Sequence, residues 1–157
     1  MPTMKIIATE NINPLQKECI YKLWNEAYPS TIVYNSIDQL DDYLNSLAEV
    51  THYFFMDTDD VIAGWAVTFI RNNEKWFAII VNKDFQGKGA GSRILSHLKE
   101  HNAALSGWVI DEGGYLKSDG SAYRAPLHFY LKNGFQLVEN VILDIPQMKA
   151  VKICWHG

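Results

Sequence analysis

The pattern of apolar positions in the first third of the chain predicts one strand and two helices. Residues 4–9 form a short apolar run, and Asn13 followed by Pro14 then supplies a helix N-cap and a proline at the first helical position. The apolar residues that follow recur at helical spacing until Pro29. A second helix is expected from Ser36, because the next apolar residues form one stripe: Ile37, Leu40, Leu44 and Leu47.

Strand-like segments follow one another in the middle of the chain. Residues 52–56, 61–70 and 76–81 are rich in β-branched and aromatic side chains, which predicts an antiparallel meander. The remaining elements are predicted as a helix containing Ile94, Leu95 and Leu98, a strand at 105–110, a polar loop at 111–124, a short helix from Pro126 to Gly134, and strands at 136–144 and 148–155. This order predicts an α/β fold, a mixed α+β sheet of about seven strands with four helices on its two faces. Because the chain has no repeat or linker, residues 1–157 are expected to form a single domain.

Composition excludes several classes of protein. The 157 residues are 48% hydrophobic and carry a formal charge of −4, so neither disorder nor binding to nucleic acid is expected. The longest uncharged apolar stretch, residues 61–70, is far shorter than the ~18 residues of a membrane span. The three apolar residues after Lys5 are too few for a secretory signal. Cys19 and Cys154 form no metal-ligand or redox pair, which favours core thiols in a reducing cytoplasm.

A glycine-rich segment between a predicted strand and a predicted helix is the first candidate for chemistry. It runs Gln86-Gly87-Lys88-Gly89-Ala90-Gly91-Ser92 and begins five residues after Val81. Such a turn directs backbone N–H groups at an anion, and the helix dipole adds to the attraction. The phosphate motif GxxxxGK is excluded by Asn82, and GxGxxG is excluded by Ser92 or Ile94 at its third glycine position.

Two motifs on either side of a predicted helix and strand point to a known family. The first is Gln-x-x-Gly-x-Gly at residues 86–91, and the second is Tyr130 four residues before Gly134-Phe135. With the order of elements, they resemble the GNAT superfamily of acyl-CoA-dependent N-acetyltransferases over residues 4–155. The resemblance implies the GNAT fold, acetyl-CoA as the acyl donor, and transfer of its acetyl group to a primary amine of a small molecule or peptide.

The resemblance also implies where acetyl-CoA binds. In GNAT proteins the strand ending at Val81 and the strand at 105–110 separate, which leaves a strand edge for an extended ligand. A backbone N–H of that edge would polarise the thioester, and Tyr130 is the expected general acid. Ile79, Ile80 and Val81 would pair with the pantetheine arm, and the pyrophosphate would be held by Gln86, Gly87, Lys88, Gly89, Ala90, Gly91 and Ser92.

Residues at the end of the first predicted helix are expected to border the acceptor. Trp24, Glu26 and Tyr28 would give aromatic walls with a carboxylate, which suit a cationic amine. Asp111 and Glu112 are the carboxylates best placed to take a proton from the amine.

Two departures from the family pattern leave the acceptor side open. Lys75 stands where some members have a glutamate base, and Tyr123 stands where many have an asparagine. The general base is therefore unassigned, and a polyamine, an amino sugar, an amino acid and a peptide N-terminus all remain candidate acceptors. The sequence is also compatible with a homodimer.

Two features of the sequence are compatible with functions other than acetyl transfer. His97-Leu-Lys-Glu100-His101 matches the HxxEH pattern of a zinc-protease helix, although a solvated helix face explains the same residues and no metal is expected. The second alternative is a non-catalytic sensor or scaffold that binds acyl-CoA without turnover.

Overall fold

The computed structural model describes residues 4–111 and 113–157, and seven strands form one sheet within them. The strand order is β1-β2-β3-β4-β5-β7-β6. The strands are β1 (Lys5–Thr9), β2 (Ala48–Met56), β3 (Ile62–Arg71), β4 (Glu74–Val81), β5 (Ala104–Ile110), β6 (Gln136–Ile145) and β7 (Met148–His156). All neighbouring pairs are antiparallel except β4 and β5, which are parallel.

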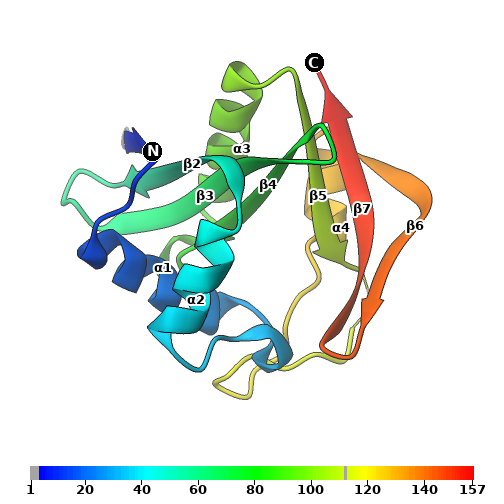
Figure 1. Ribbon diagram of the computed structural model, residues 1–157, viewed down its shortest axis with the longest axis horizontal. Coiled ribbons are helices and arrows are strands. Elements are labelled where there is room, and N and C mark those ends of the chain that lie inside the picture. The colour runs from blue at the N-terminus through cyan, green and yellow to red at the C-terminus, as the bar shows by residue number, and fades with distance from the viewer. Residues whose placement is uncertain (1–3, 112) are drawn as a thin grey trace.

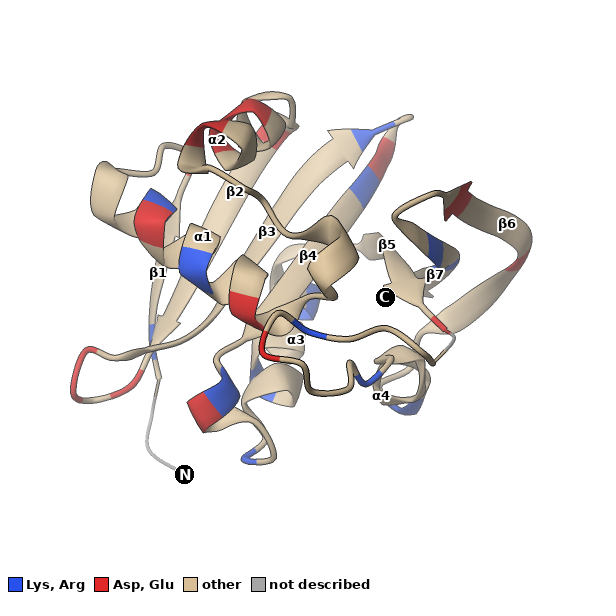
Figure 2. Ribbon diagram, turned by 90° about the horizontal axis from the view of Figure 1, so that it is seen from below, with Lys and Arg blue, Asp and Glu red and all other residues tan. Residues whose placement is uncertain are grey.

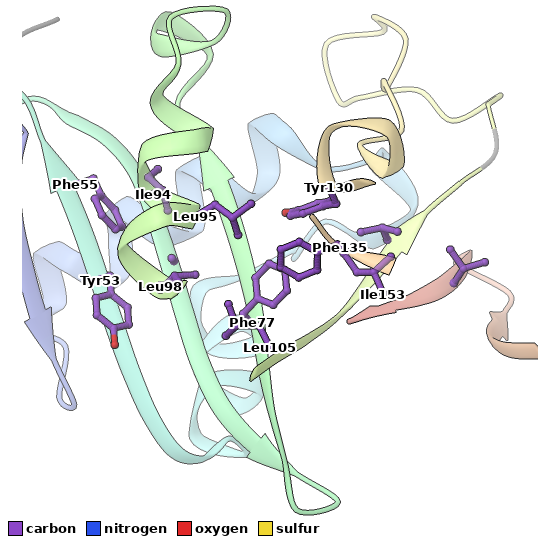
Figure 3. Packing of buried hydrophobic residues seen from close by; sticks show 13 residues of the cluster. Tyr53, Phe55, Phe77, Ile94, Leu95, Leu98, Leu105, Tyr130, Phe135 and Ile153 are labelled. Carbon is purple, nitrogen blue, oxygen red and sulfur yellow. The ribbon is translucent and has the colours of Figure 1, made fainter. Parts of the chain in front are cut away.

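Helices cover both faces of the sheet (Figure 1). The helices are α1 (Pro14–Ala27), α2 (Ile37–Asn45), α3 (Ala90–His101) and α4 (Leu127–Lys132), with short 3-10 helices η1 (Ser30–Ile32) and η2 (Lys83–Phe85). α1 and α2 contribute to one core cluster together with Trp65, Phe69 and Trp76. α3 and α4 contribute to a second cluster on the opposite face, where Phe77 and Tyr130 meet (Figure 3). The mixed sheet and its four helices confirm the predicted fold class.

Local signals account for most element boundaries. The Asn13 side chain accepts from the N–H of Gln16 at 2.8 Å, and the N–H of Asn13 donates to Oε1 of Gln16 at 2.9 Å, which completes a capping box at α1. Asn72 and Asn73 have φ of 52° and 61°, the two left-handed residues of a tight hairpin between β3 and β4.

The predicted start of β2 was wrong by four residues, because the strand begins at Ala48 rather than at His52. Its first part is irregular, with a register shift between Ala48 and Thr51 and a φ of 49° at Glu49. Such a bulge breaks the alternation of polar and apolar residues that predicts a strand. Along the residues that the structure describes, no helix is long and apolar enough to cross a membrane.

The parallel strands β4 and β5 stay paired at one point. Trp76 and Ser106 form their single bridge, and the strands diverge beyond it toward Val81 and Ile110 (Figure 1). On the outer side, β4 is paired with β3 along its whole length, and β5 is paired with β7. The separation therefore opens the sheet between β4 and β5, while the pairing of β4 with β3 and of β5 with β7 is kept.

Candidate active site

A cleft opens where β4 and β5 separate. Its volume is about 1070 Å³, and its walls come from β4, β5, the glycine-rich segment with the start of α3, α4, the end of α1 and the loop before α4. Phe129 lines it from the side of α3 and α4, and Trp76 lines it from the side of α1 and α2. The cleft therefore extends through the sheet and has room for two ligands that meet between the strands.

The backbone of β4 offers polar groups along one wall of the cleft. The N–H of Asn82 donates to the carbonyl of Ala63 at 2.8 Å, and hydrogen-bonded pairs with β3 alternate from that point. Because every second residue of β4 bonds to β3, the backbone groups of Ile80 pair with β3. The N–H and C=O groups of Ile79 and Val81 point the other way, toward β5. Because β5 has already diverged there, the N–H and C=O groups of Ile79 and the N–H of Val81 can pair with a ligand. The carbonyl of Val81 accepts from Nε2 of Gln86 at 3.4 Å.

The glycine-rich segment forms a turn of backbone N–H groups at the start of α3. Gly87 and Gly89 have φ of +74° and +79°, and a Cβ on either would meet no heavy atom within 4 Å. The first turn of α3 carries no acidic residue and no side-chain cap, so its N–H groups are available to an anion. Lys88 is exposed and does not line the cleft, whereas the other residues predicted at the pyrophosphate do: Gln86, Gly87, Gly89, Ala90, Gly91 and Ser92.

Tyr130 lines the cleft from α4. Its side chain is 7% exposed and meets Phe77 and Phe135 edge-on, with ring centroids 5.6 and 5.5 Å away. Figure 3 shows its oxygen directed toward α3. Burial raises the pKa of Tyr130, and the nearby Tyr123 adds to the effect, so the hydroxyl keeps its proton at neutral pH.

Two more tyrosines belong to the same part of the cleft. Burial raises the pKa of Tyr28 well above its usual range, and Tyr123 and Tyr130 add to that shift. Burial raises the pKa of Tyr123 to about 12. Tyr28, predicted from the sequence, thus joins Tyr130 in a group of neutral hydroxyls that can donate hydrogen bonds.

Beyond the tyrosines the cleft ends in an aromatic chamber lined by Trp24, Tyr43, Phe69, Trp76 and Trp108. Trp24 is 9% exposed, and its indole N–H donates to the carbonyl of Ile32 at 2.9 Å. The predicted acceptor residue Trp24 therefore offers a ring surface rather than a free donor. The rings of Trp76 and Trp108 lie 5.3 Å apart and close the chamber from the side of the sheet.

Arg71 brings a positive charge into the chamber. Its guanidinium carbon lies 5.0 Å from the centre of the Phe69 ring and 5.5 Å from that of Trp76. Figure 2 shows that the charged positions of β3 and β4 gather at their shared hairpin, where Arg71 ends β3. Cation–π contacts of this length hold a guanidinium against aromatic rings.

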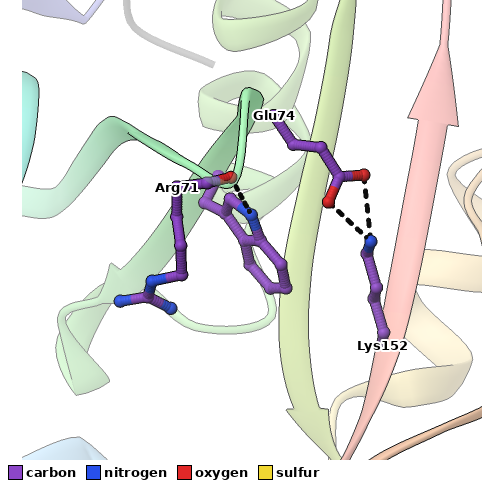
Figure 4. A network of polar contacts seen from close by, with 4 residues as sticks. Arg71, Glu74 and Lys152 are labelled. Carbon is purple, nitrogen blue, oxygen red and sulfur yellow. Dashed lines mark hydrogen bonds and ion pairs between the residues drawn. The ribbon is translucent and has the colours of Figure 1, made fainter.

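The carboxylate of Glu74, on the same hairpin as Arg71, pairs with Lys152. Both oxygens of Glu74 accept from the ammonium of Lys152, at 2.9 and 2.8 Å, whereas the Arg71 guanidinium points away from this pair (Figure 4). The Lys152 ammonium also lies 5.2 Å from the Trp76 ring. Glu74 shares the sheet face of Trp76, two residues along β4, but Lys152 holds its carboxylate and it does not line the cleft.

Of the carboxylates predicted on the acceptor side, the two that the structure describes do not line the cleft. Asp111 is exposed, and Glu26 lines a small separate cavity beside Val81 and Gln86, so neither lines the cleft itself. Glu112 lies outside the described residues. Among the residues that the structure describes, no carboxylate and no histidine lines the cleft. The expected acidic wall for a cationic amine is therefore replaced by an arginine.

The HxxEH residues lie on α3, away from the cleft. Potential ligand atoms of His97, Glu100 and His101 lie within 4.8 Å of one another. The ring of His97 packs edge-on against Tyr53 and Phe55, at 5.5 and 5.7 Å. This arrangement on an outer helix gives a peptidase reaction no substrate-binding cleft.

Sequence reasoning missed most of the chamber. Arg71 lies in a turn-like segment, where a charged residue is common. Tyr43 lies on an amphipathic helix outside the apolar stripe, where a tyrosine is equally common. Lys117 and Arg124 come from the loop before α4, which folds back through a bridge between Leu116 and Ala122. Only long-range packing brings these residues to the cleft, so no local pattern could have identified them.

Comparison with known proteins agrees with this geometry. A family model described as an acetyltransferase (GNAT) domain matches residues 49–137, more than half of the chain. The comparison with curated proteins finds no match.

Solved structures share the fold over nearly the whole chain. An aminoglycoside 6'-N-acetyltransferase complexed with coenzyme A has a TM-score of 0.71 at 15% identity, covering 97% of this chain and 96% of that one. A spermidine/spermine N-acetyltransferase, SpeG from Vibrio cholerae, has a TM-score of 0.67 at 16% identity, covering 98% and 92%. At such identities the likeness concerns the fold, whereas the domain match establishes the family. The chain belongs to the GNAT family and is an acetyl-CoA-dependent N-acetyltransferase.

Proposed function

We propose that the enzyme acetylates a primary amine of a small molecule or peptide in the cleft between β4 and β5, with Tyr130 as the general acid. The observation that carries this proposal is the single β4–β5 bridge at Trp76 and Ser106. Beyond it, unpaired backbone groups, a glycine-rich anion site and the Tyr130 hydroxyl border one space.

The residues along β4 and α3 fit acetyl-CoA. The outward N–H and C=O groups of Ile79 and the N–H of Val81 suit an extended pantetheine amide chain, because a strand edge pairs with another amide. Next to them, Gly87 and Gly89 leave open space beside backbone N–H groups, where a pyrophosphate can approach closely. Bound in this way, acetyl-CoA supplies a thioester whose carbonyl carbon is open to attack by an amine.

The chain supplies a donor for each charge that develops during transfer. The N–H of Ile79 can donate to the thioester oxygen as it becomes negative. The amine nitrogen bonds to the acetyl carbon, the carbon–sulfur bond breaks, and the Tyr130 hydroxyl provides the proton for the leaving sulfur. The nitrogen releases its extra proton to water, and Tyr130 regains a proton from solvent, so protons balance over one turnover.

The environment of the amine supports its neutral, nucleophilic form. Arg71 is the positive charge in the aromatic chamber, and no carboxylate of the described residues lines the cleft. A nearby cation and an apolar wall both lower the pKa of an amine. We therefore propose that the acceptor enters neutral rather than being deprotonated by a protein base.

The test measures acetylated amine by mass spectrometry, with acetyl-CoA and a panel of primary amines. Tyr130→Phe is expected to lower kcat at least 10²-fold while leaving CoA affinity within about threefold. Tyr53→Phe is the matched control, since Tyr53 packs in the same core cluster without lining the cleft, and it should retain kcat. Equal kcat in Tyr130→Phe and wild type would contradict the assigned acid. CoA binding without acetylation of any amine is the result expected of a sensor and would overturn the proposed reaction.

A further inference from the structure

The cleft contains a cation where a polyamine acetyltransferase would need an anion. We propose, building on the proposed function, that the acceptor is an amino acid with an aromatic or apolar side chain, whose carboxylate binds to Arg71. The amine would then point toward the Tyr130 side of the cleft, and the side chain would lie among the rings of the chamber.

Arg71 is oriented for binding a ligand. Its guanidinium lies against the rings of Phe69 and Trp76, at 5.0 and 5.5 Å, and close enough to the Tyr43 hydroxyl to act on its pKa. Burial raises the pKa of Tyr43, and the charge of Arg71 counteracts that rise. Arg71 also forms a side-chain hydrogen bond with Tyr43. A guanidinium has five N–H donors, so Arg71 keeps donors that can bind a carboxylate through two hydrogen bonds.

Arg71 has no counterion among the residues that the structure describes. No carboxylate of residues 4–111 and 113–157 lies within ion-pairing distance of its guanidinium, because Glu74 is held by Lys152. Within the described part of the chain, the other charged residues that line the cleft are Lys117 and Arg124, both positive. A half-buried guanidinium is stabilised by an anion, so a ligand carboxylate would complete the site, whereas a polyamine would add like charges.

The chamber selects the rest of the acceptor by shape and surface. Its walls are aromatic, and the indole N–H groups of Trp24 and Trp76 already donate to the carbonyls of Ile32 and Arg71. The walls therefore offer ring faces and few free polar groups to the ligand. Such a surface favours an apolar or aromatic side chain over a sugar, which would need many hydrogen-bond partners.

The test compares an amino acid with its amide, which lacks the carboxylate, and with a polyamine. L-phenylalanine, L-phenylalaninamide and spermidine are assayed with wild type, Arg71→Gln and Arg71→Lys, with rates expressed per neutral amine. Wild type should prefer phenylalanine to its amide at least tenfold. Arg71→Gln should lower kcat/KM for phenylalanine about 10- to 100-fold and change that for the amide less than threefold. The kcat/KM of Arg71→Lys for phenylalanine should lie between those of wild type and Arg71→Gln, because lysine keeps the charge but loses the paired donors.

Lys75→Gln is the matched control for charge. Lys75 belongs to the same hairpin, but its side chain alternates to the face opposite Trp76 and does not line the cleft. This variant should leave both acceptors unaffected. A wild-type preference for the amide or for spermidine, or an equal loss on all acceptors in Arg71→Gln, would overturn the inference while leaving acetyl transfer intact.

A binding measurement separates this inference from the proposed reaction. With CoA present, calorimetry compares N-acetylphenylalanine with its N-methylamide. Binding of the carboxylate at least tenfold tighter in wild type, and lost in Arg71→Gln, would support the carboxylate site even if no amine were acetylated. Equal affinity for the two probes would overturn it.

Discussion

The carboxylate of Glu74 holds the ammonium of Lys152 with both oxygens, at 2.9 and 2.8 Å, and so ties β4 to β7 across β5. The side chain of Lys152 is 14% exposed and that of Glu74 is 44% exposed. The pair lies next to the position where some GNAT proteins have a glutamate base, yet its geometry is that of a structural clamp.

Glu74→Gln is therefore expected to lower the free energy of unfolding by about 1 kcal/mol or less and to leave kcat/KM unchanged from pH 6 to 9. Chemical denaturation and pH–rate profiles measure the two effects. Glu10→Gln, at an exposed position after β1, controls for the loss of one negative charge. A new or displaced acidic limb in Glu74→Gln would show that this carboxylate takes part in proton transfer.

The pH dependence of the reaction should follow the acceptor rather than the enzyme. No carboxylate or histidine of the described residues lines the cleft, and burial keeps Tyr28, Tyr123 and Tyr130 protonated at neutral pH. The rate should rise with pH until the amine is neutral, so two acceptors whose amines differ in pKa should give acidic limbs displaced by the same difference. A limb that stays at one pH for every acceptor would reveal a protein base.

Gly89→Ala should weaken acetyl-CoA binding about tenfold. Alanine at a φ of +79° is strained by about 1 kcal/mol, and its methyl group would project beside the backbone N–H groups at the start of α3. Gly114→Ala is matched in strain, with a φ of +98° and open space around its Cβ, but it does not line the cleft. The Tm of both variants should fall by a similar amount, whereas calorimetry should show weaker CoA binding only in Gly89→Ala. Unchanged CoA affinity in Gly89→Ala would argue against the pyrophosphate site.

A buried histidine should make the fold sensitive to acid. His52 is 2% exposed, its Nδ1 accepts from the indole N–H of Trp65 at 3.1 Å, and burial lowers the pKa of His52 to about 4. The unfolded chain takes up this proton near pH 6.5 and the folded chain only near pH 4, so stability falls as pH decreases between these values. The loss can reach about 3 kcal/mol.

His52→Asn tests this assignment, because an asparagine oxygen can still accept from Trp65 but does not titrate. Urea unfolding at pH 7, 5.5 and 4.5 should show a shallower decline than in wild type. His128→Asn, at an exposed position on α4, should keep the wild-type slope. Parallel declines in His52→Asn and wild type would assign the acid sensitivity to other groups.

The sequence predicted the elements and the donor side of the site because both are encoded locally. The Asn13 cap, the glycine segment and the Tyr130-to-Gly134 spacing each act within a few residues, and the structure has the corresponding turns and helices. The acceptor side depends on contacts across the fold. Arg71 becomes part of the cleft only because Phe69 and Trp76 turn their rings toward it.

The loop before α4 shows the same limit. The sequence predicted a polar loop at 111–124 with candidate acceptor residues in it, but not how the loop folds. In the structure, the N–H of Ser30 donates to the carbonyl of Leu116 at 2.7 Å, and the Tyr115 hydroxyl accepts from the N–H of Lys149 at 3.0 Å. These distant partners hold the loop as a wall of the cleft, and they cannot be inferred from the spacing of residues along the chain.

The lone bridge between Trp76 and Ser106 has a consequence for how the molecule responds to its donor. The strands β1–β4 form one half of the sheet and β5–β7 the other, and this bridge joins the two halves. In the proposed binding mode, pantetheine lies between the two halves as an additional strand would. Bound acetyl-CoA would then stabilise the junction between the two halves. Amide hydrogens of Ile79 and Val81 should exchange with solvent slowly in the loaded enzyme and quickly in the empty one, whereas the exchange rates of amides in β2 and β3 should not depend on acetyl-CoA.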